Sequence, residues 1–287
     1  MRYFLSFLNM GLLRLVTLFL KPVSKFLQWR VRAKIERAPD PIFIIGAPRT
    51  GSTFLYQALT DSLDVLFIDN IACRFNRDLF FGLWLSEQVF RGKPHDCFSS
   101  RFGATQGAHS PSECGEFWYR WLPRDQHFVD HNEIDRRIIE QIRKEVLGPS
   151  SYFGKPLLFK NLNAGQRLRL IVEAFPNARL IYLKRNENDV VSSMLKARHS
   201  LGIPKNMIWS IRPKNYEKIE SLSEEEMCRE QIRLLQRQIE RDIPLFPRRN
   251  VFCLHYEELT KSGIQNLCAW LEISPRRHAS LTQLMST

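Results

Sequence analysis

The feature that most constrains the fold is a short apolar segment that leads through a small loop into a helix-compatible segment, over Pro41 to Leu59. Residues 42–45 read Ile-Phe-Ile-Ile, a run typical of a buried strand. Gly46 and Gly51 let the backbone turn tightly, so that successive N–H groups point into one concavity. The first turn of the following helix adds unpaired donors and the positive end of its dipole. This layout predicts a binding site for a phosphate or a sulfate.

The loop differs from the Walker A loop of nucleotide-binding proteins. Walker A requires Lys directly after its second glycine, whereas this chain has Ser52 there, and its loop cation is Arg49. A magnesium-nucleotide site, and with it a P-loop kinase or nucleotide-binding protein, is therefore the less favoured alternative. The remaining alternative is a strand, turn and helix whose glycines only allow a close crossing.

The loop sequence Pro-Arg-Thr-Gly-Ser-Thr, at residues 48–53, resembles the 5′-phosphosulfate loop of one enzyme family. These are the sulfotransferases that use 3′-phosphoadenosine 5′-phosphosulfate (PAPS) as sulfuryl donor, whose loop reads P-[KR]-[ST]-G-[ST]-[ST]. The resemblance implies that the 5′-phosphosulfate is held by Arg49, Thr50, Gly51, Ser52, Thr53 and Phe54.

A second signature lies in the second half of the chain. The predicted strand 179–184 runs into Arg185-Asn186, with Asp189 four residues and Ser193 eight residues beyond the arginine. This resembles the family's 3′-phosphate element, and it implies that Arg185 and Ser193 bind the 3′-phosphate of the donor. An arginine suits that role because its planar guanidinium offers several donors to one phosphate. Two signatures in the right order, each at a strand-to-helix junction, support the resemblance far better than either alone.

The arrangement of predicted elements indicates an α/β fold. Strands are predicted at residues 42–45, 65–68, 157–159, 179–184 and 251–254, with helical patterns between them, including one over 74–90. We therefore expect a three-layer sandwich with a central, mostly parallel sheet, formed by one catalytic domain over residues 41–287. Ligands of such folds gather at the carboxyl ends of the strands, so Lys160 is expected beside Arg49.

The catalytic base is harder to predict. Cytosolic sulfotransferases have Lys-Thr-His at the strand end that corresponds to Lys160, with the histidine as base, but here that position is Leu162. The base must then come from elsewhere, and the candidates in order are Glu113, Asp69 and His109. Several sulfotransferases carry an acidic residue facing the acceptor at the position of Asp69, although a helix cap explains this residue equally well.

The acceptor is predicted from a polar stretch and the aromatic residues that follow it. Residues 91–112 have no convincing period and are interpreted as a long functional loop. Just beyond it, acidic side chains lie close to Phe117, Trp118, Tyr119 and Trp121. Aromatic rings stack on the apolar face of a sugar while a base takes a hydroxyl proton, so we expect a glycan or glycolipid acceptor. The alternative is a buried aromatic cluster with acids at the surface.

Neither a metal nor a disulfide framework is expected. The six cysteines show no metal-binding spacing. Sulfuryl transfer also places less charge on the transferred group than phosphoryl transfer does, so it does not demand a metal.

The N-terminal segment, residues 1–40, is expected to be separate from the catalytic domain. It carries eight Lys and Arg residues against Glu36 and Asp40, within a chain of net charge +12. On a helix, its basic and polar residues fall on one side and its Phe, Leu and Val residues on the other. This pattern predicts an amphipathic helix that binds an anionic membrane surface through residues 1–37. A helix packed on the domain and a single membrane span are the alternatives.

Location and partners follow from these patterns. The sequence has no N-x-[ST] glycosylation acceptor, which favours a reducing, non-glycosylating compartment. We therefore predict a cytoplasmic protein peripheral to a membrane, with a single-span anchor as the alternative. No nucleic-acid motif accompanies the basic residues, so no nucleic-acid partner is expected. A catalytically inactive, membrane-associated binding protein remains a rival to the enzyme.

Overall fold

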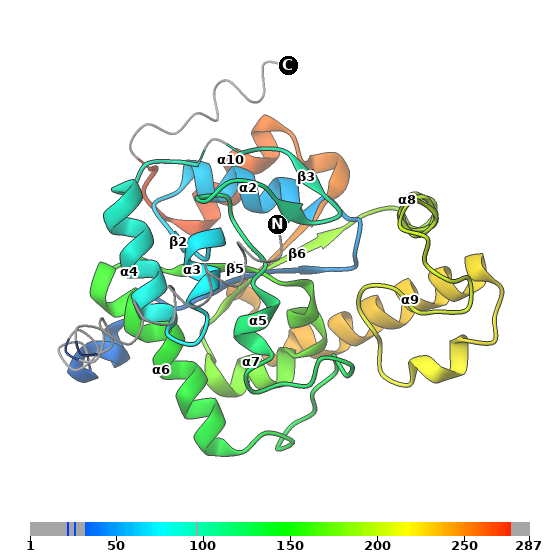
Figure 1. The fold of residues 1–287 in the computed structure, drawn as a ribbon, viewed down its shortest axis with the longest axis horizontal. Helices are drawn as coiled ribbons and strands as arrows, with labels where there is room; N and C mark the ends of the chain where they lie inside the picture. Colours follow the sequence, from blue (N-terminus) through cyan, green and yellow to red (C-terminus); the bar gives the residue numbers. More distant parts are fainter. Residues whose placement is uncertain (1–21, 23–25, 27–31, 96, 277–287) are drawn as a thin grey trace, which may run out of the picture.

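The computed structural model describes residues 22, 26, 32–95 and 97–276. Its centre is a five-stranded sheet in the order β2-β5-β1-β6-β7, in which every neighbouring pair is parallel (Figure 1). The strands are β1 (Ile42–Gly46), β2 (Leu66–Phe67), β5 (Leu157–Lys160), β6 (Arg179–Lys184) and β7 (Val251–His255). This confirms the predicted α/β sandwich with a parallel sheet.

Helices cover both faces of the sheet. In the view of Figure 1, α2 and α10 lie above the sheet, α6 and α7 lie below it, and α8 and α9 lie to the right. The helices are α2 (Ser52–Ser62), α3 (Asn70–Arg74), α4 (Leu79–Phe90), α5 (Gly115–Trp118), α6 (Arg136–Phe153), α7 (Leu168–Ala174), α8 (Glu187–Ser200), α9 (Glu224–Asp242) and α10 (Lys261–Leu271).

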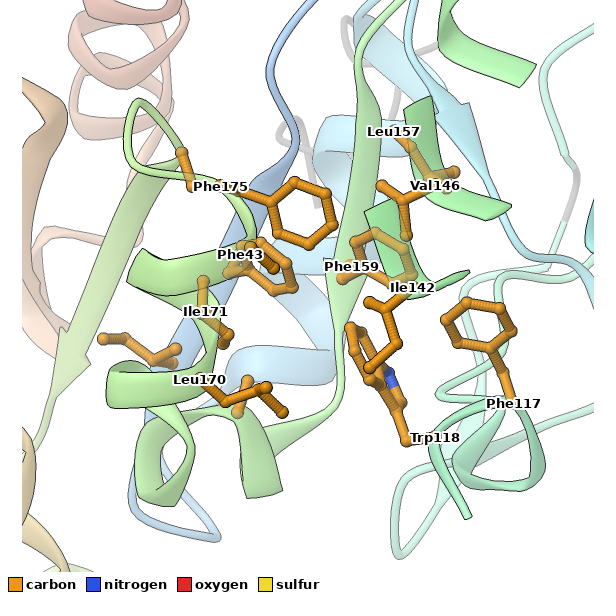
Figure 2. Close-up of a cluster of buried hydrophobic side chains, with 14 of the residues drawn as sticks. Phe43, Phe117, Trp118, Ile142, Val146, Leu157, Phe159, Leu170, Ile171 and Phe175 are labelled. Carbon is orange, nitrogen blue, oxygen red and sulfur yellow. The ribbon is translucent and has the colours of Figure 1, made fainter. Parts of the chain in front are cut away.

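The alternating side chains of β1 explain why both faces are buried. Phe43 and Ile45 belong to one core cluster, and Ile42 and Ile44 belong to a second cluster with residues of α2 and α10. Phe43 stacks on Phe159 of β5 with 5.1 Å between ring centroids, and Figure 2 shows the two rings side by side. A strand buried on both faces reads as a continuous apolar run, which is what the sequence displays here.

The helix predicted over residues 74–90 begins later, as α4 at Leu79, and a separate short helix, α3, ends at Arg74. Asp69 begins α3 by accepting a hydrogen bond from the Ala72 N–H, and Asp78 begins α4 by accepting one from the Phe81 N–H. Each carboxylate satisfies a donor that the first turn of a helix leaves unpaired, so the chain stops and restarts. The apolar periodicity of the sequence continues through the turn between the two helices, so it did not reveal the cap at Asp78.

The polar stretch 91–112 contains a short hairpin, β3 (Ser100–Arg101) and β4 (Ala104–Thr105). Beyond the hairpin the chain returns to the sheet, where Ser112 N donates to Ile68 O at 2.7 Å. That return brings Cys114, just before α5, against α3.

A disulfide joins Cys73 to Cys114 across 41 residues, and it corrects the prediction that the cysteines form no disulfide. The spacing of the cysteines in the sequence did not predict this pair, because the two residues meet only after the chain has returned to the end of β2. The cysteines therefore give no support to the predicted reducing compartment.

The predicted amphipathic helix over residues 1–37 falls almost entirely outside the described residues. Its last part is a 3-10 helix, η1 (Arg32–Arg37), whose Ile35 packs on the core beside α6. Among the described helices, none has the length and apolar character needed to cross a membrane.

Candidate active site

Four neighbouring strands each deliver one group to the same edge of the sheet. In their spatial order, β5 ends at Lys160, β1 leads into the loop 47–51, β6 is followed by Arg185, and β7 is followed by Tyr256. These groups line one cavity of about 370 Å³. The predicted site residues that line it are Arg49, Gly51, Ser52, Thr53, Phe54, Glu113, Lys160 and Arg185. Arg49 and Arg185, 136 positions apart in the sequence, therefore share one cavity.

The amino end of α2 is open toward this cavity. Gly51 precedes the helix with φ +88°, a left-handed conformation that favours glycine, and an added Cβ would lie 2.9 Å from the Tyr256 ring. The first helical hydrogen bond runs from Leu55 N to Gly51 O, so the helix does not use the N–H groups of residues 52–54. No side chain caps α2 or the short helices α5 and α7, whereas a side chain caps each of α4, α6, α8, α9 and α10. Free donors and the helix dipole make this end suitable for an anion.

Two guanidinium groups lie beside that helix end without a carboxylate partner among the described residues. Arg49 Nε donates to Ser193 Oγ at 3.1 Å, and Arg185 Nη1 donates to the backbone oxygen of Arg49 at 3.2 Å. The Arg185 guanidinium lies 3.9 Å from the centre of the Tyr256 ring, and its buried Nε has no partner in the described part of the chain. Burial, together with the nearby charge of Arg185, lowers the pKa of Arg49. A bound anion would offset this lowering, because its negative charge favours the charged form of the guanidinium.

A buried lysine connects the helix end with a carboxylate. Lys160 is 3% exposed, its Nζ donates to Thr53 Oγ1 at 3.0 Å, and it forms an ion pair with Glu113. Asn161 Nδ2 donates to the backbone oxygen of Glu113 at 3.4 Å. The hairpin turn closes over the same carboxylate, because an added Cβ on Gly103 would lie 2.8 Å from Glu113 Oε1. Glu113 is thus held at the wall of the cavity by two separate segments, the end of β5 and the hairpin turn.

Asp69 and His109 lie together but do not line this cavity. Asp69 is fully buried, caps α3 and accepts a hydrogen bond from Ser86. His109 Nδ1 lies 2.8 Å from Asp69 Oδ2, and its Nε2 lies 2.9 Å from the backbone oxygen of Lys93. The helix cap that explained Asp69 equally well in the sequence is present. Of the three candidate bases, Glu113 alone is beside Lys160.

Several residues that line the cavity were not predicted as site residues. Tyr256 is one of them, although it directly follows a strand end, as Arg185 does, so a signal for it was available in the sequence. Phe102 lies 5.7 Å from the Arg49 guanidinium, and its ring meets that of Trp209 at 6.4 Å. Both aromatic residues come from segments without a helical or strand period, so the sequence gave no reason to single them out.

The arrangement offers donors for an extended anionic ligand and a carboxylate that can accept a proton. Arg49 lies beside the open amino end of α2 in the cavity, and Arg185 lies next to Arg49. Glu113 and Lys160 complete the wall. No cluster of three or more His, Cys, Asp or Glu residues suited to a metal ion occurs in the described ranges.

Comparison with known proteins was made for both structure and sequence. The fold is similar to sulfotransferase STF9 from Mycobacterium avium, with a TM-score of 0.54 and 13% identity over 90% of this chain and 70% of that one. It is equally similar to sulfotransferase STF1 from Mycobacterium tuberculosis H37Rv, at 0.54 and 13% over 92% of this chain and 77% of that one. No curated protein sequence matches the chain. The sequence profile of the sulfotransferase family matches residues 41–276, so the chain belongs to the sulfotransferase family.

Proposed function

We propose that this protein transfers the sulfuryl group of PAPS to a hydroxyl of a carbohydrate or glycolipid acceptor. The observation that carries the proposal is the uncapped amino end of α2, with Arg49 and Arg185 beside it and without carboxylate partners in the described residues. A site with so many unused donors is complementary to a ligand with two separate anionic groups. PAPS has such groups in its 5′-phosphosulfate and its 3′-phosphate, and it supplies a sulfuryl group bonded to a phosphate leaving group.

We assign the donor-binding residues by the two signatures. The 5′ end is held by Arg49, Thr50, Gly51, Ser52, Thr53 and Phe54, and the 3′-phosphate by Arg185 and Ser193. The fit is supported by Arg185 Nε, a buried donor that lacks a partner among the described residues. It is also supported by the N–H groups of residues 52–54, which α2 leaves unused.

Lys160 and Glu113 perform the remaining steps in this proposal. Glu113 takes the proton of the acceptor hydroxyl, which makes the oxygen a better nucleophile. Lys160, Arg49 and the loop N–H groups stabilise the charge that develops on the leaving phosphate. Lys160 contacts both Thr53, on the donor side of the cavity, and Glu113, the proposed base. Asp69 and His109 are the second and third choices as base, and their mutual hydrogen bond favours a supporting role.

The carbohydrate acceptor is supported by the aromatic rings near Glu113. Tyr119 and Trp209 lie close to the cavity, and rings of this kind stack on sugars. A glycolipid acceptor would agree with a peripheral membrane attachment through residues 1–37 on the cytoplasmic side. That attachment stays a prediction from the sequence.

Replacing each candidate base in turn tests the assignment. We expect Glu113→Gln to lower kcat by about 10²- to 10⁴-fold with radiolabelled PAPS, because general base catalysis contributes about that factor. Binding of adenosine 3′,5′-bisphosphate, the desulfated donor, should persist. Asp69→Asn and His109→Gln should mainly lower stability, and Glu140→Gln, on the exposed side of α6, is the matched control.

Other results would contradict separate parts of the proposal: the base, the activity or the ligand. Wild-type turnover by Glu113→Gln would show that the base is wrong while sulfuryl transfer stands. No transfer from PAPS to any glycan or glycolipid, with the donor still bound, would favour an inactive binding protein. Magnesium-dependent nucleotide binding in place of PAPS binding would favour a P-loop kinase.

A further inference from the structure

A second groove opens directly beside the active-site cavity. Its volume is about 470 Å³, and Trp209 and Ser210 line both hollows. A hydrogen bond of 2.9 Å from Asn163 Nδ2, in the cavity wall, to Tyr119 Oη, in the groove wall, joins the two at another point. The groove and the cavity that holds Glu113 are therefore adjacent, with Trp209 and Ser210 in the wall of both.

The walls of the groove combine aromatic rings with positive charge. Tyr119 and Trp209 supply the rings, and Arg124 and Arg212 supply two guanidinium groups against the one carboxylate of Asp125. Rings of this kind suit the flat, apolar face of a sugar, which leaves the guanidinium groups for its substituents.

Arg212 is the cation that remains available for a ligand. Its Nη1 donates only to the backbone oxygen of Asp125, at 3.3 Å, and it makes no ion pair within the described residues. Arg124 differs, because it lies 4.8 Å from the Tyr119 ring centre and is paired through both outer nitrogens with Glu116. That pair is exposed, so it contributes little and can exchange for a ligand.

A buried histidine holds the backbone at Arg212. His127 Nδ1 accepts a hydrogen bond of 2.7 Å from the backbone N–H of Arg212. Burial, with the charges of Arg167 and Arg212, lowers the pKa of His127 to about 4, so the ring is neutral near pH 7. Since Nδ1 accepts, the ring hydrogen resides on Nε2. The neutral ring of His127 thus adds no charge to the wall of the groove.

We infer that this groove is the acceptor subsite and that it selects a sugar ring bearing a negatively charged group, which Arg212 binds. The inference rests on the proposed sulfuryl transfer and narrows its acceptor. A neutral sugar would stack on the aromatic rings but would leave a guanidinium without an anionic partner. An acidic sugar satisfies both parts of the groove at once.

Three matched probes test this inference. They are p-nitrophenyl β-D-glucoside, the corresponding β-D-glucuronide, and the glucoside carrying a 6-sulfate. They share the ring and the aglycone, and the two charged probes distinguish a carboxylate from a sulfate. We expect at least one charged probe to show kcat/KM about tenfold above the glucoside, because a charged hydrogen bond is worth about that factor. The advantage should shrink with added salt.

Arg212→Gln should remove this advantage by lowering kcat/KM for the charged probe about tenfold. The matched control is Arg137→Gln, which removes an equal charge from the exposed start of α6 and should keep the preference. Equal rates for all three probes, or a preference that survives in Arg212→Gln, would overturn the inference while leaving the transferase intact.

A binding measurement covers the case in which no probe is sulfated. Protein saturated with adenosine 3′,5′-bisphosphate should bind a charged probe more tightly than the glucoside by calorimetry, and Arg212→Gln should lose the difference. Absent or equal binding would overturn the inference. Failure to bind adenosine 3′,5′-bisphosphate at all would instead refute the proposed function, from which this inference proceeds.

Discussion

Arg185 illustrates how a single side chain acquires a binding geometry. It follows the last residue of β6, lies flat on the Tyr256 ring, and donates to the backbone oxygen of Arg49. These contacts use the face of the guanidinium and one nitrogen, and they leave Nε without a partner in the described residues. A planar fork that is already oriented loses little entropy when a phosphate binds.

Arg185→Lys tests whether shape matters in addition to charge. Lysine keeps the positive charge but loses the planar fork and the flat contact with Tyr256. We expect the affinity for adenosine 3′,5′-bisphosphate to fall about tenfold by calorimetry. Arg248→Lys, at an exposed position, is the control. An unchanged affinity in Arg185→Lys would show that this arginine acts only as a point charge.

At the scale of elements, the start of α2 is where backbone conformation and ligand binding meet. Gly51→Ala forces a side chain into a left-handed conformation and against the Tyr256 ring, at 2.9 Å. Gly154, after α6, has φ +67° with nothing within 4 Å of an added Cβ, so Gly154→Ala measures the backbone cost alone. That cost is about 1–2 kcal/mol.

We expect Gly51→Ala to lose more unfolding free energy than Gly154→Ala in urea titrations. It should also weaken binding of adenosine 3′,5′-bisphosphate, because the displaced Tyr256 ring supports Arg185. Equal losses, with unchanged binding, would mean that the loop adapts to the extra methyl group.

The disulfide is the second device at this scale. Cys114 directly follows Glu113, so the bond to Cys73 in α3 fixes the backbone beside the proposed base. Reduction should lower the unfolding free energy by about 2–4 kcal/mol, since the disulfide restricts a long loop in the unfolded chain. It should also lower kcat. In denaturant titrations with and without reductant, a Cys73→Ala/Cys114→Ala variant should not respond, and an equal response would point to another thiol.

The elements differ in how far the sequence predicted them. All five strands of the sheet were predicted, because each contains an apolar run; four of them are largely buried, whereas β7, at the edge of the sheet, exposes Cys253 and His255. The signatures led to Arg49 and Arg185 for the same reason, since each follows such a strand. Trp209 and Cys73 were missed because their roles depend on how irregular segments return to the sheet, for which local periodicity contains no signal.

At the scale of the whole molecule, two buried histidines make stability depend on pH. Burial lowers the pKa of His95 to about 4, and burial also lowers that of His127 to about 4, against 6.5 for an ordinary histidine. Between these values the unfolded chain binds more protons than the folded one. Stability is therefore complete above about pH 6.5 and is lost as the pH falls toward 4.

Urea unfolding across this range should show that loss, with up to about 1.4 kcal/mol per pH unit from each histidine. His95→Gln should flatten the slope, because glutamine does not titrate. A slope that His95→Gln does not alter would assign the effect to other groups.

The order of the strands has a consequence for how such a protein tolerates change. The spacing of Lys160, Arg185 and Tyr256 is maintained by backbone pairing among adjacent strands, from β5 through β1 and β6 to β7. The turns at the opposite rim hold none of these three residues. Insertions, fused tags and many substitutions at the opposite rim should therefore leave anion binding intact, so this rim is the place to attach additional domains.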